Sequence, residues 1–94
     1  MSSALFSPIT LRKLTLANRI VVSPMCQYTA RDGSANDWHL MHLGQFSVAG
    51  PGLVIMEATA VEPRGRITYG DLGLYSDDNE AALARIVAFF REYG

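Results

Sequence analysis

The sequence predicts an α/β fold in which short strands alternate with helices. Two continuous apolar runs, at residues 20–23 and 53–56, are typical of strands that are covered on both faces. A stretch with helical spacing follows each run, and a weakly alternating segment precedes the first. Strands that alternate with helices form right-handed βαβ units, so we expect a parallel sheet preceded by a hairpin.

The first element is a hairpin within residues 5–18. Its apolar positions alternate with polar ones on either side of Arg12-Lys13, and they are Ile9, Leu11, Leu14 and Leu16. Alternation over two such short segments is typical of a pair of antiparallel strands. The strand at residues 20–23 follows, and it stops abruptly at Ser23-Pro24.

A loop at residues 29–36 leads into the first helix, which we expect over residues 37–49. Asn36 or Asp37 is a suitable amino-terminal cap, and Gly50-Pro51-Gly52 ends the helix. Its apolar face is expected to include Leu40, Leu43 and the pair Phe46-Ser47.

The second strand begins at Leu53 and ends near residues 57–60, and residues 61–76 are predicted to be irregular. Asp77 and Glu80 form a D-x-x-E capping pattern for a second helix. One face of that helix carries Leu83, Ile86, Val87 and Phe90, and Gly94 ends both the helix and the chain. Two parallel strands leave two edges unpaired, so this segment needs more strands than it carries.

Composition excludes several classes of protein. The 94 residues are 49% hydrophobic, and 8 Lys and Arg stand against 9 Asp and Glu, so no basic surface for nucleic acid is indicated. A single cysteine excludes an internal disulfide framework and a cysteine-rich zinc site. No stretch approaches the roughly 18 apolar residues of a membrane span, and the first fifteen residues lack the core of a signal peptide. We therefore expect no membrane and no nucleic-acid partner, and a cytoplasmic location.

Familiar phosphate-binding and nucleophile motifs are absent. The sequence contains no G-x-G-x-x-G, no P-loop and no G-x-S-x-G elbow. Arg64 and Arg66 are a close basic pair in a loop, where a solvated role is much more common than phosphate or substrate contact.

Cys26 and Tyr28 follow the first predicted strand. The carboxyl ends of parallel strands are where ligands bind in α/β folds, so a thiol there can touch a cofactor. A small buried hydrophobic residue is an equally good interpretation of Cys26, and Tyr28 alone could be a packing aromatic residue.

His39 and His42 lie three residues apart on one face of the first helix. Further metal ligands at suitable spacing are lacking, so we predict no metal site and favour structural histidines. A nucleophilic dyad with Cys26 is the sharper alternative, but the helix is expected outside the sheet. Glu57 ends the second strand, either paired with an arginine or backbone amides or exposed at the mouth of the sheet.

Three separated segments carry a family resemblance: residues 18–28 read NRIVVSPMCQY, residues 57–68 read EATAVEPRGRIT and residues 71–77 read DLGLYSD. They resemble the old yellow enzyme family, and in particular its thermophilic-like branch of bacterial ene-reductases and xenobiotic reductases. The WHLMH segment at residues 38–42 fits as well. The resemblance covers essentially the whole chain, and the motifs occur in the family's order.

The resemblance implies an FMN-containing (β/α)8 barrel that passes hydride from NADH or NADPH to an activated alkene. Residues 1–94 would then be a partial TIM-barrel domain, with the hairpin at 1–18 and the first two βα units at 19–94. By that likeness the flavin is lined by Ser23, Pro24, Met25, Cys26 and Ala60. Cys26 would tune the flavin potential beside its reactive edge, and Tyr28 would face the substrate.

The chain departs from the family by stopping after the second helix. By the resemblance, the histidines that hold the substrate carbonyl, the proton-donating tyrosine and the flavin phosphate site lie on later strands. We therefore expect the chain alone to be catalytically silent and to bind FMN weakly or not at all. It would need the remainder of the barrel or an oligomeric partner.

Two rival interpretations stay open. The first is a non-enzymatic βαβα module that associates with itself or docks on a partner to cover its sheet edges. The second is a hydrolase with Cys26 as nucleophile, which lacks a credible base and orienting acid.

Overall fold

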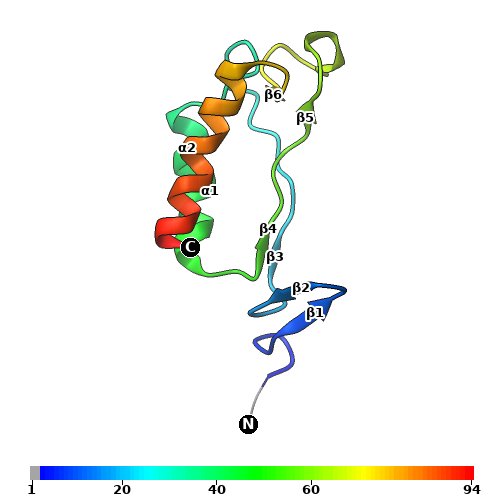
Figure 1. Cartoon of the computed structure of the whole chain (residues 1–94), viewed down its shortest axis with the longest axis vertical. Coiled ribbons are helices and arrows are strands. Elements are labelled where there is room, and N and C mark those ends of the chain that lie inside the picture. Colours follow the sequence, from blue (N-terminus) through cyan, green and yellow to red (C-terminus); the bar gives the residue numbers. More distant parts are fainter. Residues whose placement is uncertain (1–2) are drawn as a thin grey trace.

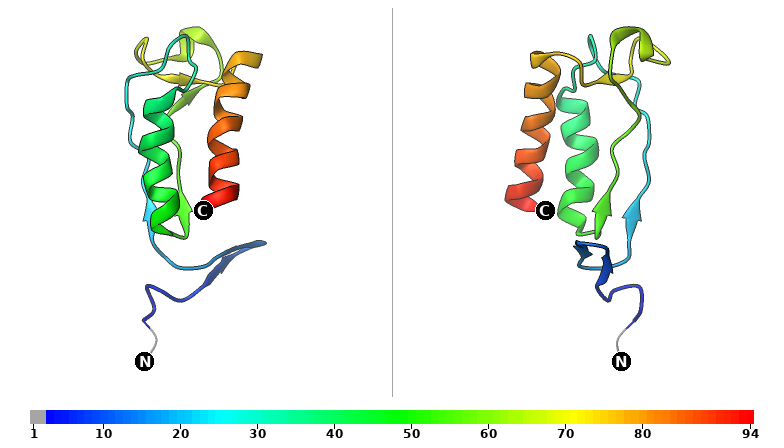
Figure 2. Two further views of the ribbon diagram at one scale, coloured as in Figure 1. Left: turned by 90° about the vertical axis from the view of Figure 1, so that its left-hand side faces the viewer. Right: turned by 45° about the vertical axis from the view of Figure 1, so that its right-hand side comes forward.

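The structure, a computed structural model, describes residues 3–94 as an elongated molecule with principal dimensions of 49, 23 and 21 Å. Two helices lie side by side on one side of a ribbon of short strands, and a hairpin projects beyond the amino ends of those strands (Figure 1). The turned views in Figure 2 show no described segment on the other side of the ribbon. The strands are therefore covered on one face by this part of the chain.

The predicted hairpin is confirmed. Strand β1 (Ile9–Leu11) pairs antiparallel with β2 (Leu14–Leu16), and Arg12 takes a left-handed φ of 55° in the two-residue turn. The hydroxyls of Thr10 and Thr15 lie 2.9 Å apart across the pair. Leu16 is buried, whereas Leu11 and Leu14 are about half exposed, so one residue anchors the hairpin. Residues 1 and 2 of the predicted hairpin region lie outside the described residues.

The expected parallel pair is present, although its strands are shorter than predicted. Strand β3 (Val21–Val22) lies parallel to β4 (Leu53–Val54), and the Val22 carbonyl accepts a hydrogen bond of 3.0 Å from Ile55 N–H. The crossover between them contains helix α1 (Asp37–Ala49). These elements form the predicted βαβ unit.

A second parallel pair was not predicted. Strand β5 (Thr59–Ala60) lies beside β6 (Leu72–Gly73), with a 3-10 helix, η1 (Pro63–Gly65), between them. The prediction that residues 61–76 are irregular is therefore wrong at β6. A two-residue strand has no periodicity to detect, and the flanking glycines look like loop residues, yet Leu72 is completely buried.

Helix α1 begins and ends as the sequence predicts, but its buried face differs. Asn36 is the cap, and Gly50 ends the helix with a left-handed φ of 81°. The buried residues are His39, Leu43, Gly44 and Ser47, whereas Leu40 and Phe46 are half-buried. A Cβ on Gly44 would lie 3.1 Å from the Phe89 ring, so this glycine allows the second helix to approach closely.

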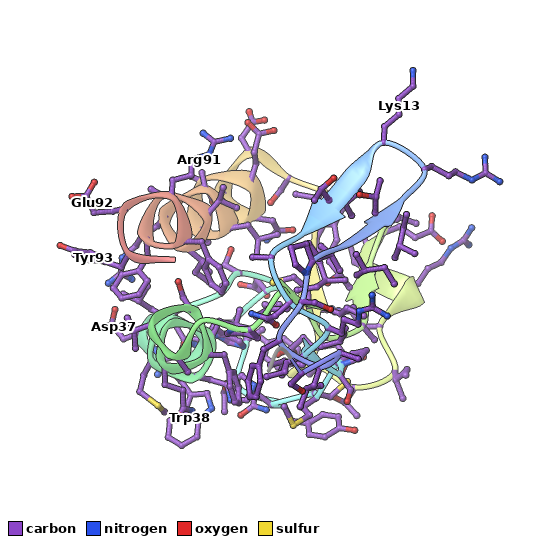
Figure 3. All side chains as sticks on the ribbon, turned by 90° about the horizontal axis from the view of Figure 1, so that it is seen from below. Lys13, Asp37, Trp38, Arg91, Glu92 and Tyr93 are labelled. Atoms are coloured by element: carbon purple, nitrogen blue, oxygen red, sulfur yellow. The ribbon has the colours of Figure 1, made fainter. Side chains whose placement is uncertain are left out.

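Helix α2 (Asp77–Tyr93) is capped one residue earlier than predicted. Ser76 is the cap, and its hydroxyl accepts a hydrogen bond of 3.1 Å from Asn79 N–H, so the proposed Asp77–Glu80 box is wrong. Ile86 is buried as expected, but Val87 is 48% exposed. Val87 and Leu83 line an open apolar groove with Leu74, on a face that we expected to be core. Arg91, Glu92 and Tyr93 project from the last turn of α2 into solvent (Figure 3).

Candidate functional site

The segment that follows β3 exposes most of the residues selected from the sequence. Ser23, Pro24 and Met25 are exposed, and Cys26 is a half-buried free thiol. Met25 is 43% exposed, so its thioether is accessible to a ligand. The segment lies at the carboxyl end of β3, where parallel α/β folds bind ligands.

Tyr28 lies in an unusual backbone conformation at this end of the sheet. Its φ is 56°, a left-handed value that non-glycine residues rarely adopt, and 58% of the side chain is exposed. Its backbone packs against Gly70, where an added Cβ would lie 2.6 Å from the Tyr28 carbonyl carbon. Gly70 therefore has to lack a side chain for the Tyr28 backbone to lie there.

Ala60 lies on β5, the strand that follows the Glu57 segment. It is half-buried, and its carbonyl accepts a hydrogen bond of 2.8 Å from Leu74 N–H just beyond β6. Gly70, which precedes β6, accepts a hydrogen bond of 3.0 Å from Ala30 N–H. The strand that carries Ala60 is thus connected through β6 to the segment that carries Tyr28.

Glu57 is a buried carboxylate between the two βα units. Its Oε1 lies 3.5 Å from Gln27 N, the backbone amide between Cys26 and Tyr28. Burial raises the pKa of Glu57 above its usual range; the hydrogen bond from Gln27 opposes this shift, and Asp71 reinforces it. Of the two roles considered for Glu57, pairing with a backbone amide is the one observed.

His39 is completely buried, and its tautomer follows from its partners. Its Nδ1 accepts a hydrogen bond of 3.0 Å from Asn36 N–H, so the proton of the neutral ring is on Nε2. Nε2 lies 3.4 Å from Thr29 Oγ1 and 4.0 Å from Glu57 Oε2. Burial lowers the pKa of His39, and the neighbouring His42 lowers it further. A neutral His39 is not half of an ion pair with Glu57, and with both nitrogens engaged it is no base for Cys26.

His42 makes a different contact. Its ring meets Phe46 edge to face, with 5.3 Å between the centroids. Among residues 3–94 no group of three or more His, Cys, Asp or Glu side chains is arranged to hold a metal ion. The same residues include no helix that is both long enough and apolar enough to cross a membrane.

The basic pair in the loop is engaged within the loop itself. Arg64 forms a well-exposed ion pair of 2.7 Å with Glu62. The Arg66 guanidinium lies 5.1 Å from the centroid of the Tyr69 ring, and its Nε donates to the Pro63 carbonyl. Arg64 agrees with the solvated interpretation, whereas Arg66 is half-buried and its Nη1 is buried without a hydrogen-bond partner among the described residues.

Two buried polar residues near the carboxyl ends of the strands, Asp71 and Asn79, were not predicted from the sequence. Asp71 accepts hydrogen bonds from Ile67 N–H at 2.7 Å and from the Thr68 hydroxyl at 3.0 Å. Although burial opposes it, these hydrogen bonds and Arg66 lower the pKa of Asp71. Asn79 donates to the Asp32 carbonyl and Ser34 Oγ and accepts from Tyr75 N–H. The one available sequence signal for Asn79 is its place three residues after the cap Ser76.

The chain matches the NADH:flavin oxidoreductase / NADH oxidase family over residues 4–94. It belongs to that family. The match covers all the elements described above, from the hairpin to the end of α2. The resemblance to old yellow enzymes is thereby confirmed.

Curated relatives support the assignment. An NADH:flavin oxidoreductase of Gibberella zeae is 51% identical over 88 residues, which are 94% of this chain and 21% of that protein. An NADPH dehydrogenase of Geobacillus thermodenitrificans is 46% identical over 96 aligned positions, which cover 100% of this chain and 28% of that protein. The chain therefore spans about a quarter of the length of the relatives it matches.

Solved structures agree in fold. Morphinone reductase in complex with tetrahydroNAD superimposes with a TM-score of 0.86 and 28% identity, over 99% of this chain and 25% of that one. The old yellow enzyme of Pichia sp. AKU4542 gives 0.87 and 30%, over 97% and 24%. The expected fold class is confirmed: the chain is the amino-terminal part of a TIM barrel, with its hairpin and two helices in place.

The residues after β3 fit one part of a flavin. Met25 and Tyr28 are exposed and Cys26 is half-buried, so a thioether, a phenol and a thiol are available to a flat aromatic ring. No phosphate-binding glycine loop occurs in the sequence. The exposed and half-buried side chains after β3 therefore suit the ring of FMN.

Proposed function

We propose that this chain forms the first two βα units of an FMN-dependent ene-reductase. The complete barrel would take hydride from NADH or NADPH and deliver it to an α,β-unsaturated carbonyl compound. The observation that carries the proposal is the segment after β3, where a family member exposes thiol, thioether and phenol side chains at the carboxyl end of a barrel strand.

Each selected residue has a distinct role in this proposal. Ser23, Pro24, Met25 and Ala60 line the flavin, and the small side chain of Ala60 lets the ring approach its backbone. Cys26 lies beside the ring edge, where its polarisable sulfur alters how readily the ring holds a hydride. Tyr28 shapes or hydrogen-bonds the substrate pocket.

The reaction transfers two electrons and one proton from the nicotinamide as hydride. FMN, held by Ser23, Pro24, Met25, Cys26 and Ala60, would supply the redox chemistry that links the nicotinamide to the alkene. The alkene gains hydride at its β-carbon and a proton from a donor outside residues 1–94. The residues of this chain would bind the flavin ring, adjust its potential and orient the substrate. We therefore expect the chain by itself to be inactive.

A graft tests the proposal in a complete barrel. Residues 1–94 replace the matching segment of the Geobacillus thermodenitrificans NADPH dehydrogenase, and the product is titrated with FMN and assayed for NADPH oxidation with an α,β-unsaturated ketone. We expect FMN binding and ketone-dependent oxidation. Cys26→Ala should shift the flavin potential, whereas Ser47→Ala, at the far end of α1, should not. A folded graft that binds no FMN would contradict the proposal.

One observation favours the rival function of a self-associating module. Apolar side chains at Val21, Ile55 and Val87 remain about half exposed in the described structure. Native mass spectrometry of the 94-residue chain separates the two functions. A defined oligomer that leaves FMN fluorescence unchanged favours the module, and a monomer that joins the rest of a barrel favours the enzyme. The cytoplasmic location stays a prediction.

A further inference from the structure

The first turn of α1 holds every second residue of the segment after β3. Met25, Gln27 and Thr29 are all tied, directly or through one another, to Asn36, Trp38 and His39. Among residues 3–94, the hydrogen bonds of this segment use no side-chain atom of Cys26 or Tyr28. The two residues proposed to meet flavin and substrate thus alternate with residues that are fixed.

One of these ties is a relay that starts at Trp38. Its indole Nε1–H donates to Gln27 Oε1 at 2.8 Å, and Gln27 Nε2–H donates to the Met25 carbonyl, also at 2.8 Å. Both distances are at the short end for N–H···O bonds. Trp38 is 50% exposed and projects from α1 on the side away from α2 (Figure 3), so it contributes little to the helix interface.

A second set of bonds holds the other end of the segment. Asn36 Nδ2–H donates to the Thr29 carbonyl at 2.7 Å, and the Thr29 hydroxyl lies 3.4 Å from His39 Nε2. Ala30 N–H then donates to Gly70. Backbone atoms on both sides of Tyr28 are therefore held by other elements.

These bonds act on a strained backbone. The left-handed φ of Tyr28 is costly for an aromatic residue and persists only where its surroundings impose it. Gln27 immediately precedes Tyr28, and its side chain is the one that joins α1 to the Met25 backbone. Loss of the relay would therefore free the Met25 carbonyl and the Gln27 side chain, on the two sides of Cys26, and would leave the Gln27 backbone held by Glu57 alone.

We infer that Trp38 and Gln27 are positioning residues, which set the placement of Cys26 and Tyr28 through the Trp38–Gln27–Met25 relay. This inference rests on the proposed function in one respect, namely that Cys26 contacts the flavin and Tyr28 the substrate. Neither Trp38 nor Gln27 is itself assigned to flavin or substrate.

The single cysteine gives a readout that needs no flavin. In the 94-residue chain, the rate at which Cys26 reacts with a chromogenic disulfide reagent is compared among three variants. Trp38→Phe removes the indole donor but keeps an aromatic ring, and Gln27→Ala removes the middle of the relay. Tyr69→Phe is the matched control, since it removes one donor from another exposed aromatic residue, whose hydroxyl bonds Asp32. We expect about a two- to tenfold faster reaction in the first two variants, the range for one lost hydrogen bond, and no change in the control.

The graft supplies the second readout. Trp38→Phe should shift the flavin midpoint potential, and the shift should disappear when Cys26→Ala is already present, because Trp38 acts through Cys26. A purely structural role would leave the potential unchanged in both backgrounds. Equal thiol rates for Trp38→Phe, Gln27→Ala and Tyr69→Phe, together with an unchanged potential, would overturn the inference. A graft without flavin would count against the proposed function alone, since the thiol rates would still decide the relay.

Discussion

The end of the molecule at which the strands have their carboxyl ends differs from the apolar outer faces in how completely its side chains find partners within the chain. At the carboxyl ends of the strands, His39, Glu57, Asp71 and Asn79 are buried, and each has partners within the chain. Along the uncovered strand face and the groove on α2, apolar side chains such as Ile55 and Val87 remain about half exposed.

The difference teaches which part of the chain is complete in itself. Burying a polar group without a hydrogen bond costs several kcal/mol, so a buried polar cluster persists only where its partners are already present. Apolar surface in contact with water is tolerated more easily and gains from any later covering. The loop end is therefore organised by partners within the described residues, whereas the apolar faces gain stability from any further covering.

Asn79→Ala is expected to have the largest effect on stability. It would leave the Asp32 carbonyl, Ser34 Oγ and Tyr75 N–H without their partner in a buried site. We expect the free energy of unfolding in urea to fall by about 2–4 kcal/mol. Asp78→Ala, at the neighbouring exposed position, is the control and should change it by less than about 0.5 kcal/mol. Equal effects of the two substitutions would contradict the description of a self-contained polar end.

Gly70→Ala should come next, because the new Cβ would collide with the Tyr28 backbone. We expect a loss of about 1–3 kcal/mol and a displaced Tyr28 amide resonance in an NMR spectrum. Gly65→Ala is the matched control, since its Cβ would meet neighbours at 3.7 Å or more. A Tyr28 resonance that stays in place in Gly70→Ala would show that the close packing is absent.

His39 should make stability depend on pH. Its pKa in the folded chain lies below the ordinary value of 6.5, so below that pH the unfolded chain binds the proton first. Stability from His39 is thus present above pH 6.5 and is lost as the pH falls. Glu57 acts in the opposite sense: its pKa is raised from 4.5, so its contribution is lost as the pH rises.

The variant His39→Gln isolates the histidine. Gln at this position can still accept the Asn36 N–H, as in an ordinary capping box, but it does not titrate. Between pH 7.5 and pH 5, wild type should lose stability relative to His39→Gln, while Glu57 and Asp71 act in both chains. If the urea midpoints of wild type and His39→Gln differed by the same amount at every pH in that range, the lowered pKa of His39 would be disproved.

The smallest effect is expected on the open groove of α2. Val87→Ser removes an apolar side chain that is already about half exposed, so the monomer should lose less than about 1 kcal/mol. Any self-association measured by sedimentation should weaken, because the groove is one of the surfaces available for it. Asp78→Ser, at an exposed position on the same helix that does not line the groove, is the control. A loss as large as that for Asn79→Ala would remove the contrast between the two regions.

Much of the fold could be predicted because it is written in local patterns. The turn at Arg12-Lys13, the cap Asn36 and the end at Gly50 are signals of a few residues each, and all three are confirmed. The cap of α2 was misplaced by one residue, because Asp77 and Ser76 are both good caps and only the hydrogen bond to Asn79 distinguishes them.

The polar end could not be predicted, because its bonds join distant positions. Asn79 and Asp32 are 47 positions apart, and Gln27 and Glu57 are 30 apart. The sequence does not distinguish a buried Asn or Glu from an exposed one, because polar residues do not follow the periodicity that identifies buried apolar positions. Cys26 and Tyr28 were selected by their place after a strand and by family resemblance, whereas the Trp38–Gln27 relay beside them required coordinates.

The most direct test of the account is a crystal structure of the graft with FMN bound. We predict that Cys26 Sγ lies in van der Waals contact with the flavin ring, within about 4 Å, and that Tyr28 faces the space above the ring. A flavin bound in the barrel but out of contact with both Cys26 and Tyr28 would contradict the central claim, however well the graft folds.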